Sequence, residues 1–501
     1  MRTLFLFLAI LLLSCISSCR SDFETVPSSG DLFFSRDTVY LDTVFRNIGS
    51  STYQLKVYNK SKKDISIPTI QFKNGLHSKY RMSVDGMSGT NGRIFSNVTL
   101  LAKDSLFIFI ETTADVSDAD PKSFLYTDKI LFDTGPNQQV VDLVTLIKDA
   151  IFLYPSKNAD GSKETITIED KNIEGFYLNE NDPENGNELI FTKQKPYVIY
   201  GYASVPEHKT VQFQAGTRVY FHANSGIYVG KNATLQINGF VSTTEFLEHE
   251  VIFEGDRLES NYDEIAGQWG KIWLGKGSLN NSINHLTLKN ATEGLYIQNT
   301  NKTITLIKNT QIYNCVNYGI LAENAKIKGS NIVINNSGKA NLFCSFGGNY
   351  EFTHCTFNNN WNNYNQVAVS ISNLKENTSN DGNDLIEAAF NNCIIYSTYA
   401  DALRLDKAAN VTFNYKLTNC LLKSSNKEIG ADSEHYANII LNESPQFLNV
   451  TKNQLYIDRT SSAFAKGYPA YLISADILGN TRTLPPDLGA YQSRDFPEKK
   501  K

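Results

Sequence analysis

Apolar residues occupy alternate positions in short segments that recur through the second half of the chain. In one kind of segment the first and third residues are apolar or small, and the residues that follow them are polar. It begins at six positions separated by 24, 22, 23, 38 and 27 residues: Leu286, Thr310, Ile332, Cys355, Cys393 and Cys420. An amphipathic helix would need apolar residues at positions i, i+3 and i+4, which these segments lack. The pattern therefore predicts short β-strands.

A second kind of segment shows the same alternation at similar intervals, beginning at Ile272, Leu295, Ile320, Leu342, Val369 and Leu403. Two short strands per repeat cannot bury an apolar face alone, but they can when successive repeats stack. Equivalent residues of stacked parallel strands lie about 4.8 Å apart, so they form ladders. We expect one ladder of side-chain amides at a turn, made by Asn290, Asn314, Asn336 and Asn359.

The residue between the two inward positions of each second segment points outward. Stacking predicts a row of these residues on one face, with the members Trp273, Tyr296, Leu321, Phe343, Ser370 and Arg404. Exposed aromatic rings in a row form an apolar platform with polar edges, which can hold sugar rings. The alternative is that a loop or the N-terminal domain covers the row. The candidate ligand-binding residues are therefore Trp273, Tyr296, Phe343 and Arg404.

The stacked repeats resemble the right-handed parallel β-helix. Residues 211–253 resemble the opening turns of bacterial β-helix proteins, and residues 476–482 and 486–491 resemble the closing segment of such proteins at bacterial surfaces. Residues 31–148 differ, because about seven short alternating strands in this length are typical of an immunoglobulin-type β-sandwich. Within them, residues 55–68 resemble the abnormal-spindle and hydin-like sandwich domains. The fold class predicted is all-β, with a β-helix (solenoid) preceded by an immunoglobulin-like sandwich.

The leader of the chain has the features of an export signal. Arg2 is followed by an apolar run, residues 4–13, that is too short to span a membrane. Residues 16–19 resemble a bacterial lipobox, which implies lipid attachment at Cys19; an ordinary cleaved signal with an incidental cysteine is the alternative. Asp22 and Glu24 resemble the surface-export signal of Bacteroidetes lipoproteins. The resemblance implies a lipid anchor in the cell outer membrane, with the protein at the surface or on the periplasmic face.

These observations divide the chain into seven parts. They are a lipoprotein signal peptide (1–18), an anchor linker (19–30), a β-sandwich (31–148), a linker and N-terminal cap (149–196), the β-helix (197–425), C-terminal coils and cap (426–495), and a tail (496–501).

Charge and cysteine content narrow the partners. With 47 basic and 52 acidic residues the formal net charge is -5, which argues against nucleic acid as a general partner. Beyond the leader the cysteines are Cys315, Cys344, Cys355, Cys393 and Cys420. They lie in apolar columns without paired spacing, so we expect buried free thiols. Disulfides between neighbouring coils in an oxidising periplasm are the alternative.

Few residues offer chemistry. Asp401, Arg404 and Asp406 are low-priority catalytic candidates, because an aspartate beside an arginine could serve a lyase or hydrolase; a surface ion pair is the alternative use. Asp381 and Asp384 stand in a polar insertion that could bind calcium, although the full EF-hand spacing is absent. The scattered histidines give no zinc spacing. We expect no cofactor.

Many β-helix families are polysaccharide lyases or glycoside hydrolases, so the resemblance implies carbohydrate chemistry. None of their characteristic catalytic groupings is found in this sequence. We predict a lipid-anchored envelope protein whose β-helix face binds an extended polymer, foremost a polysaccharide, without catalysis. The alternatives are a polysaccharide lyase or glycoside hydrolase, and an adhesion or structural protein that contacts other envelope or surface proteins.

Overall fold

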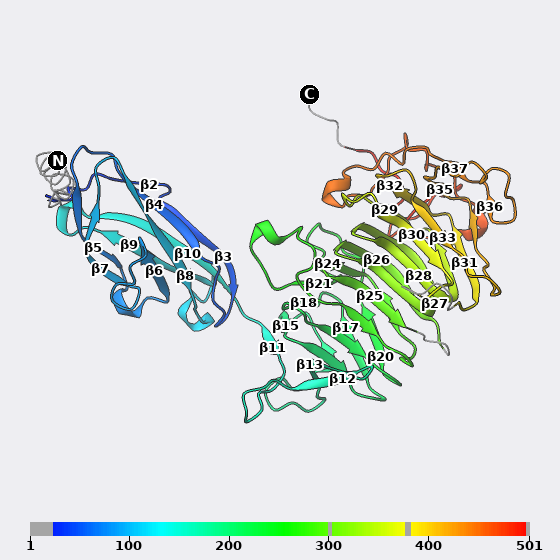
Figure 1. The fold of residues 1–501 in the computed structure, drawn as a ribbon, viewed down its shortest axis with the longest axis horizontal. Helices are drawn as coiled ribbons and strands as arrows, with labels where there is room; N and C mark the ends of the chain where they lie inside the picture. Colours follow the sequence, from blue (N-terminus) through cyan, green and yellow to red (C-terminus); the bar gives the residue numbers. More distant parts are fainter. Residues whose placement is uncertain (1–23, 299–302, 376–381, 497–501) are drawn as a thin grey trace, which may run out of the picture. The chain divides into compact units, whose positions relative to one another are not determined.

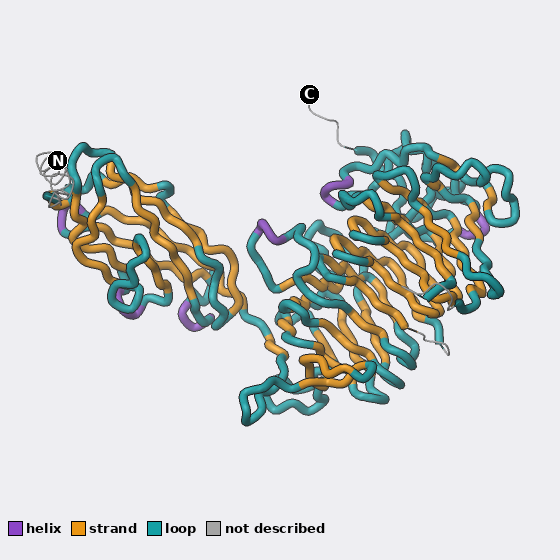
Figure 2. The backbone as a smooth tube through the Cα atoms, viewed as in Figure 1, coloured by secondary structure: helices purple, strands orange, loops and turns teal. Residues whose placement is uncertain are grey.

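The computed structural model describes residues 24–298, 303–375 and 382–496, and these residues form β-strands joined by loops and short 3-10 helices (Figures 1 and 2). The prediction of an all-β chain is confirmed. The chain divides into two compact units, Met1–Asp149 and Ala150–Lys501. The predicted leader and its lipid-attachment residue Cys19 lie outside the described residues. Within the described residues, no helix is long and apolar enough to cross a membrane.

The N-terminal unit contains two sheets. The larger has the order β1 (Val26–Pro27), β5 (Ile65–Phe72), β9 (Leu125–Phe132), β10 (Gln139–Lys148) and β3 (Thr38–Phe45), with β7 (Ile94–Leu100) paired to β5. The smaller has the order β2 (Leu32–Phe34), β4 (Tyr53–Asn59), β8 (Ser105–Thr112) and β6 (Tyr80–Val84). Alternate residues of both sheets, such as Leu55, Ile108 and Ile130, are buried in one shared core. The unit is therefore a two-layered β-sandwich.

In the described residues of the C-terminal unit, 27 strands form one sheet, and most of them pair in parallel with a strand of the next turn of the chain. We call this unit the coiled unit. Its strands form three columns. The first column contains β13 (Lys171–Tyr177), β16 (Tyr202–Val205), β19 (Gly226–Val229), β22 (Ile272–Leu274), β25 (Glu293–Gln298), the starts of β27 (Tyr318–Ser337) and β28 (Ala340–Thr353), β30 (Val367–Ser372) and β33 (Leu403–Asp406).

The other two columns complete each turn. The second contains β14 (Ile190–Phe191), β17 (Thr210–Gln214), β20 (Thr234–Asn238), β23 (Ser282–Asn284), the start of β26 (Thr305–Cys315), the middle of β27, the end of β28, β31 (Leu385–Asn391), β34 (Lys416–Thr418) and β36 (Tyr436–Ala437). The third contains β11 (Ile151–Leu153), β15 (Tyr197–Ile199), β18 (Arg218–Phe221), β21 (Val251–Gly255), β24 (Leu286–Lys289), the ends of β26 and β27, β29 (Thr356–Asn359), β32 (Ile394–Ser397), β35 (Leu421–Leu422) and β37 (Ile440–Leu441).

The expectation of two strands per repeat is wrong, because each turn has three. The two kinds of segment found in the sequence are the third and the first columns. The second column was not recognised as a repeat in residues 284–424, because some of its strands carry a single inward apolar residue between polar or charged ones. In β27, for example, Ile327 is buried between the exposed Lys326 and Lys328.

The interior of the coiled unit is one continuous apolar core. The inward residues of the first column stack in register, as Ile272 on Leu295 and Leu295 on Ile320 illustrate. Aromatic rings fill wider places, where the rings of Phe221 and Trp269 stack with centroids 4.3 Å apart. Because every turn buries its apolar residues against two neighbours, stability depends on stacking rather than on any single strand.

The expected amide ladder is confirmed at three of its four positions. Asn290, Asn314 and Asn336 all have positive φ, which asparagine tolerates better than most residues. Asn314 Nδ2 donates to Asn290 Oδ1 (3.3 Å), and Asn336 Nδ2 donates to Asn314 Oδ1 (3.1 Å). Asn359 leaves the ladder, because its Nδ2 donates to the carbonyl oxygens of Ser337 (2.7 Å) and Val367 (2.9 Å).

The five cysteines of the coiled unit are buried and free, which confirms the prediction of free thiols. Three of them form a column in which the backbone N–H of Cys355 donates to Cys393 Sγ (3.4 Å), and that of Cys393 donates to Cys420 Sγ (3.4 Å). Burial raises the pKa of the Cys393 and Cys420 thiols. Protonated thiols away from solvent are poor nucleophiles, so these residues act as packing groups.

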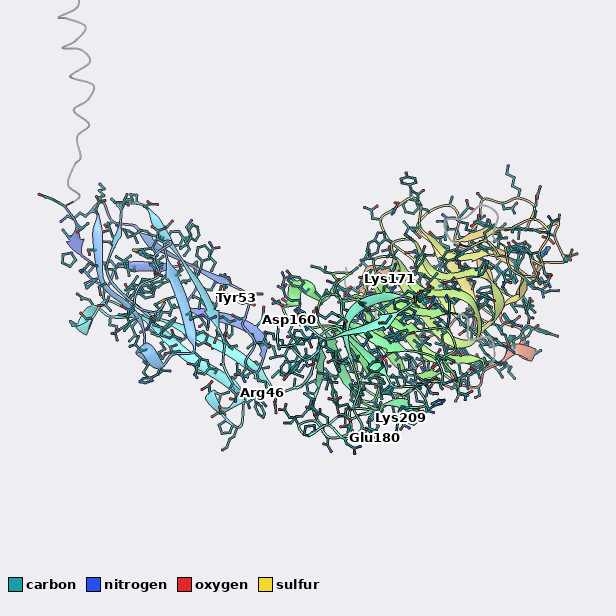
Figure 3. The ribbon with its side chains drawn as sticks, turned by 60° about the horizontal axis from the view of Figure 1, so that its bottom comes forward. Arg46, Tyr53, Asp160, Lys171, Glu180 and Lys209 are labelled. Atoms are coloured by element: carbon teal, nitrogen blue, oxygen red, sulfur yellow. The ribbon has the colours of Figure 1, made fainter. Side chains whose placement is uncertain are left out.

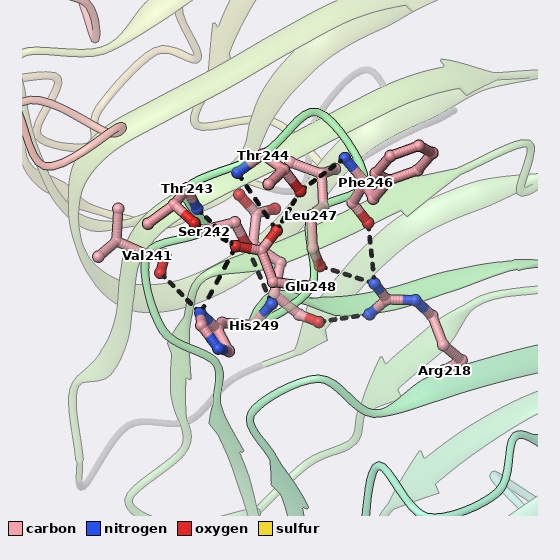
Figure 4. A network of polar contacts seen from close by, with 10 residues as sticks. Arg218, Val241, Ser242, Thr243, Thr244, Phe246, Leu247, Glu248 and His249 are labelled. Atoms are coloured by element: carbon pink, nitrogen blue, oxygen red, sulfur yellow. Dashed lines mark hydrogen bonds and ion pairs between the residues drawn. The ribbon is translucent and has the colours of Figure 1, made fainter.

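Polar contacts fasten the loops at the N-terminal end of the coiled unit. Lys209 forms an ion pair with Glu180, and the two side chains lie together in Figure 3. Arg218 of β18 holds the loop that precedes β21. Its guanidinium donates to the carbonyl oxygens of Phe246 (3.1 Å), Leu247 (2.6 Å) and Glu250 (2.7 Å) (Figure 4). The loop is held in one conformation although Phe246 itself is 86% exposed.

Residues 444–496 cross the outer face of the third column, and we call them the C-terminal strap. Leu455, Ile477 and Tyr491 of the strap pack on Tyr313 and Val333 of the column. A second cluster joins strap residues to the column further along, with the members Ile457, Ala463 and Leu488 on the strap and Ile394 and Leu421 below them. The strap covers this face, so the third column presents little of its outer surface to a ligand.

His354 makes the stability of the coiled unit depend on pH. Its side chain is fully buried, and burial together with the nearby Arg482 lowers its pKa to about 3. An unfolded histidine titrates near pH 6.5, so below that pH only the unfolded chain binds this proton. The stabilising contribution is present above about pH 6.5 and is lost as the pH falls toward about 3. At pH 5 the loss amounts to about 2 kcal/mol.

The variant His354→Asn is expected to remove this share of the pH dependence, because asparagine does not titrate. The backbone accepts asparagine here, since asparagine already occupies the equivalent left-handed positions 309, 331 and 392. The measurement is urea unfolding of protein and variant at pH 7 and pH 5. His208→Asn, at a solvent-exposed histidine, serves as the control and is expected to change nothing. An identical pH dependence in protein and His354→Asn would contradict the assignment.

Candidate ligand-binding site

The outward row predicted from the sequence exists as a line of paired residues on the first column. Trp273 pairs with Tyr296, Tyr296 with Leu321, and Leu321 with Phe343. The line continues through Ser370 to Arg404. The register of the row is therefore confirmed, while the exposure of its members differs along the line.

A hairpin covers the first part of the row. The strands β12 (Thr165–Ile168) and β13 pair antiparallel, and Ile166 and Ile168 pack against Trp273. Trp273 is only 9% exposed, and its Nε1 donates to Gln298 Oε1 (2.7 Å). The prediction that this ring stands on an open platform is wrong. Apolar side chains of the hairpin cover the ring, and the removal of apolar surface from water stabilises this contact.

The middle of the row is partly accessible. Tyr296 is half-buried, and its hydroxyl donates to Glu323 Oε2 (2.7 Å). Burial raises the pKa of Tyr296 well above its usual value, so the hydroxyl stays protonated. Phe343 is also half-buried and packs on a cluster that includes Leu321 and Val367. The row thus offers a partly open apolar strip that leads from the hairpin toward β30.

A pocket of about 450 Å³ opens at the other end of this strip. It is lined by Tyr364, Gln366, Val367, Tyr399, Ala400, Asp401, Leu403 and Arg404. Val367 belongs both to this lining and to the apolar cluster beneath Phe343. The pocket is therefore continuous with the strip.

Two loops build the pocket walls. Residues 360–366 connect β29 to β30 and carry Tyr364, which is 78% exposed. Residues 398–402 connect β32 to β33 and carry Tyr399. The loops are joined to each other, because Tyr399 Oη donates to Asn362 Oδ1 (3.2 Å). The two tyrosines are consequently held on opposite loops of one opening.

Polar groups occupy the floor and rim. Gln366 is 1% exposed, and its Nε2 donates to Asn359 O (3.2 Å) and Ser397 Oγ (3.1 Å). Its Oε1 accepts no hydrogen bond from the residues that the structure describes. Arg404 stands at the rim, where its Nη2 donates to Asn365 O (2.8 Å) and the rest of the exposed guanidinium faces solvent. A ligand that carries hydroxyl or carboxylate groups finds a donor in the Arg404 guanidinium, while Gln366 fixes the floor through its contacts with Asn359 and Ser397.

Asp401 is engaged in supporting the pocket. Its Oδ1 accepts from the backbone N–H of Ser425 (2.7 Å) and from Ser424 Oγ (3.1 Å), and its Oδ2 accepts from Ser425 Oγ (2.8 Å). These hydrogen bonds, the backbone one foremost, hold the pKa of Asp401 below its usual value. A general acid needs the opposite shift. Asp401 therefore ties the loop before β33 to Ser424 and Ser425, and its lowered pKa does not favour a role as general acid.

The other two catalytic candidates do not complete an active site. Within the part of the chain that the structure describes, Arg404 donates to Asn365 O and not to Asp406, and Asp406 is not among the residues that line the pocket. Glycoside hydrolysis ordinarily uses two carboxylates that flank the bond, one of them with a raised pKa. This pocket provides one carboxylate with a lowered pKa, which favours binding over hydrolysis of that kind.

The calcium hypothesis gains no support. Asp381 lies outside the described residues, and Asp384 Oδ1 accepts a hydrogen bond from Thr412 N (2.7 Å). Across residues 24–298, 303–375 and 382–496, no group of three or more histidine, cysteine, aspartate or glutamate side chains is placed to hold a metal ion.

Sequence reasoning missed Tyr364, Gln366 and Tyr399. For the loop that carries Tyr364 and Gln366, the available signal was the longer interval between Leu342 and Val369 compared with earlier repeats. Longer intervals at constant strand length mean longer loops, and loops on a rigid scaffold are where binding residues gather.

Comparison with known proteins identifies no family. No family model matches the chain, and no curated protein matches it. One solved structure with local similarity is a family 123 glycoside hydrolase from Clostridium perfringens, described for glycolipid glycan hydrolysis. It is 12% identical over 24% of this chain and 26% of that chain, with a TM-score of 0.17. The chain thus spans about a quarter of that enzyme's length.

A second solved structure is the ASH/PapD-like domain of human CEP192, PapD-like domain 7. It is 11% identical over 25% of this chain and 90% of that chain, with a TM-score of 0.15. Neither similarity extends to a common arrangement of the whole chain, and neither carries an argument about function.

Proposed function

We propose that this protein is a lipid-anchored protein of the bacterial outer membrane that binds an extended polysaccharide without cleaving it. In this proposal the coiled unit is a right-handed parallel β-helix and the N-terminal sandwich is immunoglobulin-like. The sugar chain occupies the pocket beside Arg404 and continues along the strip toward Phe343. The lipid is carried on Cys19.

The observation that supports this proposal is the composition of the pocket. Tyr364 and Tyr399 face one opening from two loops, with a guanidinium at the rim and an amide in the floor. Aromatic rings hold the apolar faces of sugars, while the polar groups bind their hydroxyl or carboxylate substituents. The strip that continues from the pocket gives room for more than one sugar residue. Arg404 favours a polymer with acidic sugars.

The test measures binding and cleavage together. The soluble chain that begins at Arg20 is incubated with a panel of acidic and neutral polysaccharides, and both affinity and product length are followed. Tyr364→Ala and Arg404→Ala are each expected to lower affinity about ten-fold, as truncation of an exposed aromatic or arginine contact typically does. Arg404→Ala is expected to act most strongly on acidic polymers.

Tyr154→Ala is the matched control, because Tyr154 is also an exposed tyrosine of the coiled unit, at 59%, but follows β11 at its far end. Its affinity is expected to equal that of the unchanged protein. Equal affinity in all three variants would refute the pocket as the binding site. Shortened polymer chains would instead favour the lyase or hydrolase alternative.

A further inference from the structure

Lysine side chains gather at one end of the N-terminal sandwich. The turn after β4, residues 59–64, carries Lys60, Lys62 and Lys63, and the turn before β8, residues 101–104, carries Lys103; all four are exposed. The turns are tied together, since Lys103 Nζ donates to Lys60 O and Asn59 Nδ2 donates to Leu101 O (3.0 Å).

The charge of this end differs in sign from that of the chain. The two turns hold four lysines against two aspartates, Asp64 and Asp104, which leaves a net charge of +2, whereas the whole chain carries -5. Both aspartates are also occupied locally: Asp64 Oδ1 accepts from Ala102 N (2.8 Å) and Asp104 Oδ1 from Ser105 N (2.7 Å). We call this end the lysine end.

Aromatic residues continue from the lysine end onto the outer face of the smaller sheet. Phe33 is 48% exposed and pairs with Tyr58, while Lys56 pairs with Phe107. The ammonium of Lys60 lies 3.9 Å from the ring centroid of Phe33, and that of Lys56 lies 4.8 Å from that of Phe107. Because ammonium groups already occupy these ring faces, a sugar has little free ring surface on which to stack. Rings beside mobile cationic groups suit the interface of a lipid bilayer better.

The chain enters the sandwich at this same end. Val26 N donates to Asp64 O (3.0 Å), and β1 pairs in parallel with the first residues of β5. Val26 therefore lies directly beside the turn that carries Lys62 and Lys63. Val26 is only seven positions after Cys19 in the sequence. A fully extended segment of this length spans at most about 25 Å.

We propose that the lysine end, with Phe33 beside it, docks on an anionic lipid bilayer. Lysines near such a surface are attracted to its phosphate groups, and an exposed phenylalanine gains by entering the interface. The proposed lipid anchor on Cys19 would hold this end within reach of the bilayer and so raise the local concentration of lipid around it. In this respect the inference rests on the proposed function. The attraction itself belongs to the lysine end and is testable without the lipid.

The test uses the soluble chain from Arg20, which lacks the lipid, with vesicles of phosphatidylcholine alone or mixed with phosphatidylglycerol. We expect sedimentation with the anionic vesicles only, and less of it as salt is raised. The double variant Lys62→Gln, Lys63→Gln is expected to lower the partition coefficient roughly 25-fold, about five-fold for each lysine. Lys122→Gln is the control, since Lys122 is exposed in the loop beyond the other end of β8.

Binding that ignores the lipid charge, absence of binding, or equal binding by the double variant would each overturn the proposal. So would loss of polysaccharide affinity in the double variant, because the lysine end would then belong to the polymer site. The melting temperature of the double variant checks that it is folded. The anchor is tested separately, by fatty-acid labelling of the full chain and of Cys19→Ala, so failure of the anchor and failure of the lysine end give different results.

Discussion

Arg482→Ala is expected to lower the free energy of unfolding of the coiled unit by about 3–5 kcal/mol. Arg482 lies in the C-terminal strap and is only 5% exposed. Its Nη2 donates to Asn331 Oδ1 of β27 (2.9 Å) and to the strap carbonyl oxygens of Gly489 (3.1 Å) and Ala490 (3.1 Å). Alanine would remove these three hydrogen bonds and leave Asp476 and Asp487 without the nearby positive charge. Ala490 O would still accept from Ile477 N (3.1 Å), whereas Asn331 Oδ1 would lose its Arg482 donor.

The measurement is urea unfolding followed by tryptophan fluorescence. The three tryptophans, Trp269, Trp273 and Trp361, all belong to the coiled unit, so the signal reports on that unit alone. Arg459→Ala is the control, because Arg459 is an exposed arginine of the same strap and is expected to matter by less than about 0.5 kcal/mol. Equal stability of the two variants would mean that the hydrogen bonds of Arg482 add nothing measurable to the attachment of the strap.

Trp269→Ala is expected to destabilise the coiled unit by a similar amount, about 3–5 kcal/mol. The indole is 1% exposed and stacks on Phe221 with ring planes 13° apart. Its Nε1 also donates to Lys289 O of the next turn (2.9 Å). Alanine would create a cavity between stacked turns and leave that carbonyl oxygen unsatisfied. Trp269→Phe is expected to lose less, because a six-membered ring can still stack on Phe221, while the hydrogen bond and part of the buried ring volume are lost.

Far-UV circular dichroism is the appropriate signal for these variants, since one of three tryptophans is removed. Phe246→Ala provides a control at an aromatic residue that is 86% exposed, and we expect its stability to stay within about 0.5 kcal/mol of the unchanged protein. A loss below about 1 kcal/mol for Trp269→Ala would show that neighbouring turns close over the cavity.

The structure places the candidate pocket at the last part of the row. The hairpin covers Trp273, the partly open middle contains Phe343, and Arg404 stands at a pocket whose other aromatic residues come from loops. The proposed ligand site therefore lies where the cover ends.

The sequence alone determined which residues stack. The intervals between Ile272, Leu295 and Ile320 predicted a parallel column, and the members of the outward row pair in that order through Arg404. The reason is physical: apolar residues at alternate positions must face inward, and a repeated interval brings equivalent strands together. The burial of the cysteines followed from the same columns.

Only the tertiary structure decided what covers those columns and where a pocket opens. The hairpin over Trp273 is about a hundred residues earlier in the chain, and the strap over Tyr313 comes more than a hundred residues later. The pocket needs Tyr364 and Tyr399 from separate loops joined by a hydrogen bond. Local periodicity predicts whether each side chain points into the core or outward. Contacts between distant segments depend on how complementary surfaces pack, which no interval in the sequence records.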